Sequence, residues 1–231
     1  MIYSSIDIGS NEIKFIVMEY NDNKFNVLAS YSVKSFGIKR GIITDPNLLV
    51  KSINEGNRNI EKQIGFKLDK AIITLPCYDT DTNLYETETE SSGIISGADI
   101  SNVLKKIIKE NLDSDREVVN ISPIYFNIDN EDKIIDPKGM QGYKLGLKAL
   151  ISTMPKELVL SYINVLKEAS IDVIDICYNV IGDYYVSKKE EYNDTAGAVI
   201  NIGHSKIEIG IFNKGLLITP LLLTLPNTKH L

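Results

Sequence analysis

The chain has 231 residues, of which 43% are hydrophobic and 24% are charged, and its formal net charge is −6. This balance predicts a packed globular protein with one large domain or two modest ones, and it argues against a disordered chain. The acidic balance also argues against a nucleic-acid-binding protein, whose basic residues would be clustered. The chain has two histidines and two cysteines, and Cys77 and Cys177 show no metal-ligand spacing.

Neither the first residues nor the apolar runs have the pattern of an export signal or a membrane-spanning helix. The first residues have neither the basic region nor the long apolar stretch of a signal peptide. The longest apolar run, Leu216 to Leu225, contains Pro220 and is far shorter than the roughly 20 residues of a spanning helix. Each cysteine lies in an apolar run, which is typical of a buried free thiol. We therefore expect a cytoplasmic protein that does not itself cross a membrane.

The first third of the chain has the pattern of an α/β lobe. Strands are expected at about residues 2–9, 13–20 and 24–33, joined by short turns. Asp45-Pro46 is a typical helix start and Gly65 a typical stop. The apolar run 70–76 that follows is typical of a strand covered on both faces.

A different pattern occupies residues of about 79–152. Its beginning is polar, and no helix is expected there. Residues 100–112 carry a single apolar stripe, which predicts a helix, and strand-like segments follow at 117–128 and 143–152. We interpret this region as a small α+β module inserted into the α/β lobe. A helix at about 155–169, a strand at 171–177 and a helix at 180–191 then resume the α/β pattern.

One pattern occurs twice. The segment Ile6 to Val17 reads IDIGSNEIKFIV, and Ile200 to Ile211 reads INIGHSKIEIGI, so that position 7 aligns with position 201 without a gap. Each copy predicts a strand, a polar turn with a glycine, and a second strand. Such a turn can direct backbone N–H groups outward, as phosphate-binding loops do. Either an anion lies between two pseudo-equivalent lobes, or two β-hairpins resemble each other by chance.

The first copy has the stronger set of candidate site residues. The carboxylate of Asp7 can meet Mg²⁺ or its water shell, whereas Gly9, Ser10 and Asn11 offer donors to phosphate oxygens. Lys14 on the return strand can reach the same phosphates. The structural alternatives are a turn-stabilising Asp7 and an exposed strand lysine at position 14.

The second copy is weaker. It has the neutral Asn201 where the first has Asp7, and amides are poorer Mg²⁺ ligands than carboxylates. Gly203 is followed by His204 and Ser205. Lys206 either places a cation near a γ-phosphate or is an exposed turn residue, and we favour the second interpretation.

Three features of the sequence point to one family: the DIGS…IK opening, the inserted module, and two strings, Ser114–Asp129 (SDREVVNISPIYFNID) and Asp136–Leu145 (DPKGMQGYKL). Together they resemble the bacterial cell-division family FtsA. The resemblance runs over the whole chain. It implies an actin-like (ribonuclease H-like) α/β fold of the actin/Hsp70-like ATPase superfamily. In its terms, residues 1–78 plus 153–195 form subdomain 1A, residues 79–152 the inserted subdomain 1C, an SHS2 domain, and residues 196–231 the incomplete start of subdomain 2A.

The resemblance also implies an ATP site with Mg²⁺, in which Asp7 is the metal ligand. The implied nucleotide-binding residues are Asp7, Gly9, Ser10, Asn11, Lys14, Asn201, Gly203, His204 and Ser205. The second loop of the family usually reads Asp-Ile-Gly-Gly-Gly-Thr, whereas this chain reads Asn-Ile-Gly-His-Ser-Lys. We therefore expect binding of ATP and Mg²⁺ to be weak or absent and the protein to be at most a weak ATPase, and we assign no catalytic residue.

The function that the resemblance implies is that of an adaptor. It would tether the tubulin-like FtsZ ring to the inner face of the cell membrane at the division site and recruit later division proteins, and it could self-associate through residues 79–152. The membrane-binding C-terminal segment of the family has no counterpart here, so the chain is either a fragment or a degenerate member. The unfinished apolar strand Leu216–Leu225 favours a fragment, because its apolar residues would lack partners. The alternatives are a PilM-type adaptor of pilus assembly and an actin-fold kinase.

Overall fold

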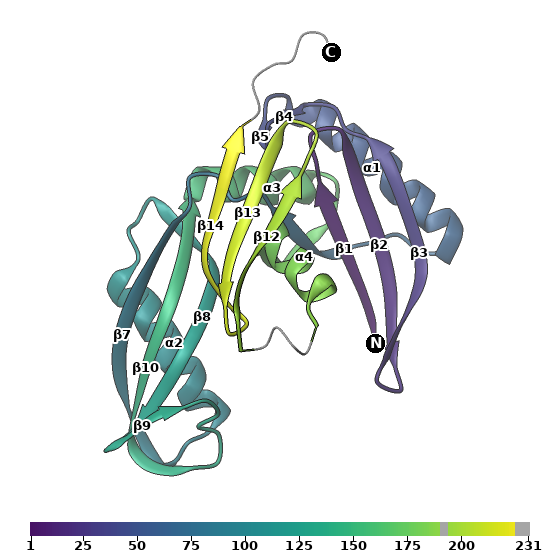
Figure 1. Cartoon of the computed structure of the whole chain (residues 1–231). Coiled ribbons are helices and arrows are strands. Elements are labelled where there is room, and N and C mark those ends of the chain that lie inside the picture. The colour runs from purple at the N-terminus through teal and green to yellow at the C-terminus, as the bar shows by residue number, and fades with distance from the viewer. Residues whose placement is uncertain (190–193, 225–231) are drawn as a thin grey trace.

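The computed structural model describes residues 1–189 and 194–224, and Figure 1 shows their arrangement. The first lobe is built on a five-stranded sheet of order β11-β6-β1-β2-β3. Its strands are β1 (Ile2–Ile8), β2 (Glu12–Asn21), β3 (Lys24–Lys34), β6 (Lys70–Leu75) and β11 (Asp172–Tyr178). β1, β2 and β3 form an antiparallel meander, and β6 runs parallel to both β1 and β11. The expected strands of this lobe are confirmed.

Helix α1 (Pro46–Ile64) packs on this sheet over β2 and β3. It begins where the sequence predicts, because the side chain of Asp45 accepts a hydrogen bond from the Leu48 amide at 3.1 Å. It ends at Gly65, which has φ 82°. A Cβ atom at Gly56 would overlap the ring of Phe15, so this glycine lets the helix approach β2 closely.

Helices α3 (Lys156–Glu168) and α4 (Asn179–Ser187) complete the lobe. Helix α4 ends at Ser187, earlier than the predicted helix 180–191, and the predicted positions 190 and 191 lie outside the described residues. A short hairpin of β4 (Ile38–Lys39) and β5 (Ile42–Ile43) connects β3 to α1. The phenolic hydroxyl of the fully buried Tyr162 on α3 donates to the carbonyl of Gly41 in this hairpin, at 2.8 Å.

The inserted module has a sheet and a core of its own, at the lower left of Figure 1. The sheet order is β7-β10-β8-β9, and α2 packs on β7 and β10. Its elements are β7 (Asp81–Ile94), α2 (Gly97–Asn111), β8 (Arg116–Ile128), β9 (Glu131–Ile134) and β10 (Gln141–Pro155). Strand β7 was missed at the sequence level, because its polar residues join the sheet through pairing with the distant β10 rather than through an apolar pattern of their own.

A third sheet contains β12 (Ala196–Ile202), β13 (Lys206–Asn213) and β14 (Leu216–Thr224), with β13 in the centre. One face packs on the first lobe, where the rings of Phe212 and Tyr184 stack at 4.0 Å between centroids. The opposite face exposes Ile200, Ile202, Leu221 and Leu223. No helix among the described residues has the length and apolar character that a membrane crossing requires.

Candidate functional site

The two repeated segments form the same hairpin. In the first, the Gly9 amide donates to the Glu12 carbonyl at 3.0 Å, and in the second the Gly203 amide donates to the Lys206 carbonyl at 2.9 Å. The strand registers also agree, because Asp7 lies opposite Lys14 and Asn201 lies opposite Glu208. The similarity between the two segments is therefore structural and extends beyond their apolar alternation.

Both turns require a small residue at their glycine. A Cβ atom at Gly9 would lie 2.8 Å from the Glu12 carbonyl oxygen, and one at Gly203 would lie 3.2 Å from that of Lys206. The first contact is with backbone and too short to be tolerated without a shift, whereas the second is only tight. The first turn is thus the more constrained of the two.

The two turns lie at the same end of the molecule, beside the β4–β5 hairpin, at the top of Figure 1. Between them is a cavity of about 210 Å³. All nine residues named from the sequence line it, and so do four others that had not been included in the set: Glu12, Asn179, Lys206 and Glu208. The fold therefore brings together every predicted nucleotide-binding residue.

Polar contacts of the first hairpin are partly solvated. The Asp7 carboxylate accepts a hydrogen bond from the Thr74 hydroxyl at 3.2 Å, and its other oxygen lies 3.8 Å from Lys14 Nζ. More than a third of both the Asp7 and the Lys14 side chain is exposed. In the turn, Ser10 Oγ accepts a hydrogen bond from the Gly41 amide at 3.2 Å, so the β4–β5 hairpin is tied to this loop.

The second hairpin instead buries an ion pair. Lys206 Nζ lies 2.9 Å from Glu208 Oε2, and the two residues are 8% and 2% exposed. The prediction that Lys206 is an exposed turn residue is wrong. Residues alternate faces along a strand, and Lys206 shares the buried face of β13 with Glu208, Gly210 and Phe212. Glu208 aligns with Lys14 inside the repeat, so the alignment itself marks this position as a candidate.

Glu208 is held by more than its lysine. Its Oε1 accepts a hydrogen bond from the Cys77 backbone amide at 2.9 Å, and its Oε2 accepts one from the Asn179 side-chain amide at 2.8 Å. These bonds join the second hairpin to the ends of β6 and β11 in the first lobe. Burial, followed by the nearby Glu208 charge, raises the pKa of the Cys77 thiol well above its usual range, so this thiol stays protonated.

Two residues that line the cavity each have a buried polar atom without a hydrogen-bond partner among the described residues. Ser205 Oγ and Asn179 Oδ1 are both buried at the atomic level, and no partner is found for either within the described part of the chain. Buried polar groups in proteins are usually paired. Asn201, by contrast, donates through its side-chain amide to Asp183 Oδ2 at 2.7 Å.

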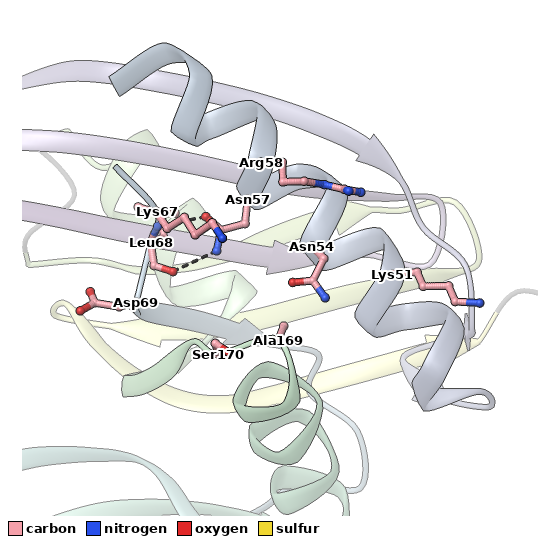
Figure 2. Close-up of a pocket in the computed structure, with 9 residues that line it drawn as sticks. All are labelled: Lys51, Asn54, Asn57, Arg58, Lys67, Leu68, Asp69, Ala169 and Ser170. Carbon is pink, nitrogen blue, oxygen red and sulfur yellow. Dashed lines mark hydrogen bonds between the residues drawn. The ribbon is translucent and has the colours of Figure 1, made fainter. Parts of the chain in front are cut away.

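A larger hollow of about 660 Å³ lies elsewhere, between α1, residues 67–69 and the end of α3 (Figure 2). Its buried polar side chain, Asn57, donates to the Leu68 carbonyl and accepts from the Leu68 amide. Its cations, Lys51, Arg58 and Lys67, are exposed. We assign it no ligand, because none of its polar groups is both buried and available.

Residues 82–153 match the model of the SHS2 domain inserted in FtsA. The cell division protein FtsA of Bacillus subtilis is 28% identical over 93% of this chain and 49% of its own length, and that of Enterococcus hirae is 32% identical over 68% and 36%. The chain thus spans half or less of the length of these relatives.

Among solved structures, a chain of a PilM–PilN type IV pilus biogenesis complex superposes with a TM-score of 0.63. The match covers 96% of this chain and 61% of the other at 12% identity, a level that shows the fold alone. The fold is therefore actin-like, with an inserted SHS2 domain. The resemblance of the chain to the N-terminal part of the cell-division protein FtsA is confirmed.

Proposed function

We propose that the cavity between the two hairpins binds the phosphates of a nucleotide, ATP by resemblance to FtsA. The observation that carries the proposal is the convergence of nine residues, from two distant segments, on one cavity. The cavity is suited to an anion, because it has two glycine turns, a polar lining and the cations Lys14 and Lys206. At about 210 Å³, the cavity is smaller than the roughly 300–1,000 Å³ of sites that enclose a drug-sized ligand. Its size suits the phosphates rather than the whole nucleotide.

Titration calorimetry with ATP tests this proposal. Replacing Lys14 by Ala removes a cation at the cavity and should weaken binding about tenfold, which corresponds to ~1.4 kcal/mol. Lys105→Ala on the exposed side of α2 is the matched control, because it removes the same charge far from the cavity. Equal affinities of the two variants would show that Lys14 is only a surface residue.

We further propose that the protein acts as an FtsA-type adaptor in cell division, an ATP-binding scaffold with weak or absent hydrolysis. In this role, it would link FtsZ polymers to the membrane at the division site and recruit later division proteins. The support comes from relatives named cell division proteins and from the SHS2 domain. Three separate sheets support the division into subdomains 1A, 1C and 2A.

Self-association through the insert is part of the same proposal. Strand β7 is an open edge of its sheet, and Leu84 on it is 50% exposed. Sedimentation analysis should show weaker self-association for Leu84→Lys than for Leu160→Lys, a control on α3 at a leucine that is 40% exposed. Loss of self-association in the α3 variant alone would place the contact outside the insert.

A further inference from the structure

We infer that this site binds phosphate without a divalent cation, and that the ammonium group of Lys206 supplies the positive charge that Mg²⁺ would otherwise bring between the two hairpins. The inference rests on the proposed function and specifies how the same site meets the charge of its ligand. It departs from the Mg²⁺ that the resemblance implies.

The donor set of the cavity does not fit Mg²⁺. This ion needs near-octahedral oxygen ligands and is usually held by one or two carboxylates together with phosphates and water. Asp7 is engaged by Thr74 and faces Lys14, whereas both oxygens of Glu208 are already taken by Cys77, Asn179 and Lys206. Each of these carboxylates thus has its own lysine, so neither presents the uncompensated charge that would attract Mg²⁺.

The other polar residues around the cavity are poor candidates for Mg²⁺ ligands. Asn201 is neutral, and its amide group is bound to Asp183. Glu12 lines the cavity, but its residue is exposed on the return strand. Over residues 1–189 and 194–224, no group of three or more His, Cys, Asp or Glu side chains could hold a metal ion.

Lys206 reaches from the second hairpin toward the residues that contact the first hairpin. It starts from the second hairpin, and its Nζ lies 3.9 Å from the Cβ position that a side chain at Gly41 would have. Gly41 in turn donates to Ser10 in the first turn. An ammonium group has three donors, so the bond to Glu208 leaves capacity for a phosphate oxygen.

The neighbouring residue supplies an independent indication of a ligand. Ser205 lines the cavity, and its Oγ is buried without a hydrogen-bond partner in the described part of the chain. A hydroxyl can donate to a phosphate oxygen. Ser205 and Lys206 together therefore form a donor pair that is already in place without metal.

Calorimetric titration of the wild-type chain with ATP, in buffer with excess MgCl₂ and in buffer with excess EDTA, tests the inference. We expect dissociation constants that agree within about threefold, a difference of ~0.7 kcal/mol, or tighter binding in EDTA because free ATP is more negative. A loss of more than tenfold in EDTA would overturn the inference and leave the proposed function standing. Absence of binding in both buffers would overturn both.

A paired substitution tests the role of Lys206. Removing the lysine alone would leave Glu208 as an unpaired buried charge and risk unfolding. The double variant Lys206→Met with Glu208→Gln removes both charges at similar volume, and its circular dichroism melt reports whether it folds. In EDTA, it should bind ATP at least tenfold more weakly, whereas Lys206→Arg should retain binding. Wild-type affinity of the folded double variant would overturn the inference.

If the double variant does not fold, the inference is decided by Ser205→Ala. This variant removes the unpaired hydroxyl without touching the ion pair. It should weaken binding in EDTA by about threefold or more, and the same affinity as the wild type would count against the donor pair.

Discussion

The two hairpins share a backbone and differ in where they place their charges. In β1–β2 the acid is on the outgoing strand, at Asp7, and the base opposite it is Lys14. In β12–β13 the outgoing strand has the neutral Asn201, and both charges, Lys206 and Glu208, are on the return strand. The first pair is partly solvated at 3.8 Å, whereas the second is buried at 2.9 Å.

The comparison shows that the backbone of the turn and the charges around it are determined by different requirements. The glycine and its hydrogen bond are the same in both copies, because they determine the path of the chain. The charges follow the environment of each copy. A buried carboxylate must be paired, so Glu208 is surrounded by Lys206, Asn179 and the Cys77 amide. Asp7 is partly solvated and does not need as many protein partners.

The largest expected effect contrasts the two ion pairs. Lys206→Ala leaves Glu208 buried without its counter-ion and should reduce the free energy of unfolding by about 3–5 kcal/mol. Lys14→Ala breaks a solvated pair and should cost less than about 1 kcal/mol. Urea denaturation followed by circular dichroism measures both values. Equal losses would mean that the two hairpins do not differ in the way described.

A second contrast concerns the glycines. Gly9→Ala forces a Cβ atom against a backbone carbonyl at 2.8 Å and should cost about 1–3 kcal/mol. Gly203→Ala meets the equivalent carbonyl at 3.2 Å, and its cost should be smaller. Thermal unfolding of the two variants side by side provides the comparison, and a larger effect at Gly203 would reverse our ranking of the two turns.

A third substitution restores the acid of the first copy in the second. Asn201→Asp removes the hydrogen bond to Asp183 and places two carboxylates together, at a cost of about 1–2 kcal/mol without metal. The new pair is a better ligand for Mg²⁺. Adding MgCl₂ should therefore restore the melting temperature of the variant more than it changes that of the wild type, and ATP turnover of an intact protein should rise. Indifference of the variant to Mg²⁺ would argue against a metal-binding role for this position.

The smallest effect is a reactivity difference between thiols. Burial, assisted by the Asp175 charge, raises the pKa of Cys177 to about 11, so at pH 8 only about one molecule in a thousand carries the thiolate. Cys77 has its pKa raised further and lies beneath the second hairpin. Labelling with a thiol reagent at pH 8 should modify Cys77 more slowly than Cys177. Glu208→Gln should speed the labelling of Cys77, and an unchanged rate would mean that this glutamate does not hold the hairpin in place.

Much of the fold could be predicted from local patterns. Apolar alternation identified β1, β2 and β3, and Asp45 and Gly65 marked the ends of α1, because their signals lie within a few residues. Strand β7 could not be predicted in this way, because its pairing with β10 spans a long stretch of sequence. The elements that could be predicted are therefore those whose signals lie in neighbouring residues of the sequence.

Nine of the residues that line the cavity were named from the sequence, whereas the electrostatics of the cavity were not predicted. The repeat placed Asp7 and Asn201 at equivalent positions, and the structure brings both to one cavity. The burial of Lys206 depends on which face of β13 packs against the first lobe. The apolar alternation of Ile207, Ile209 and Ile211 favours burial of the opposite face, whereas the structure buries the face of Lys206 more deeply. Lys206 is a neighbour of Glu208 on β13, but the other two partner groups, from Cys77 and Asn179, come from distant segments that no local pattern connects to it.

The central claim is that the two hairpins act as one phosphate clamp. Amide hydrogen exchange of the whole chain, with and without ATP, tests it most directly, because both turns are observed in the same experiment. The account predicts that ATP slows exchange at residues 9–11 and at residues 203–205 together, with α2 of the insert unchanged as an internal reference. Protection of one turn alone, or of neither at saturating ATP, would contradict it.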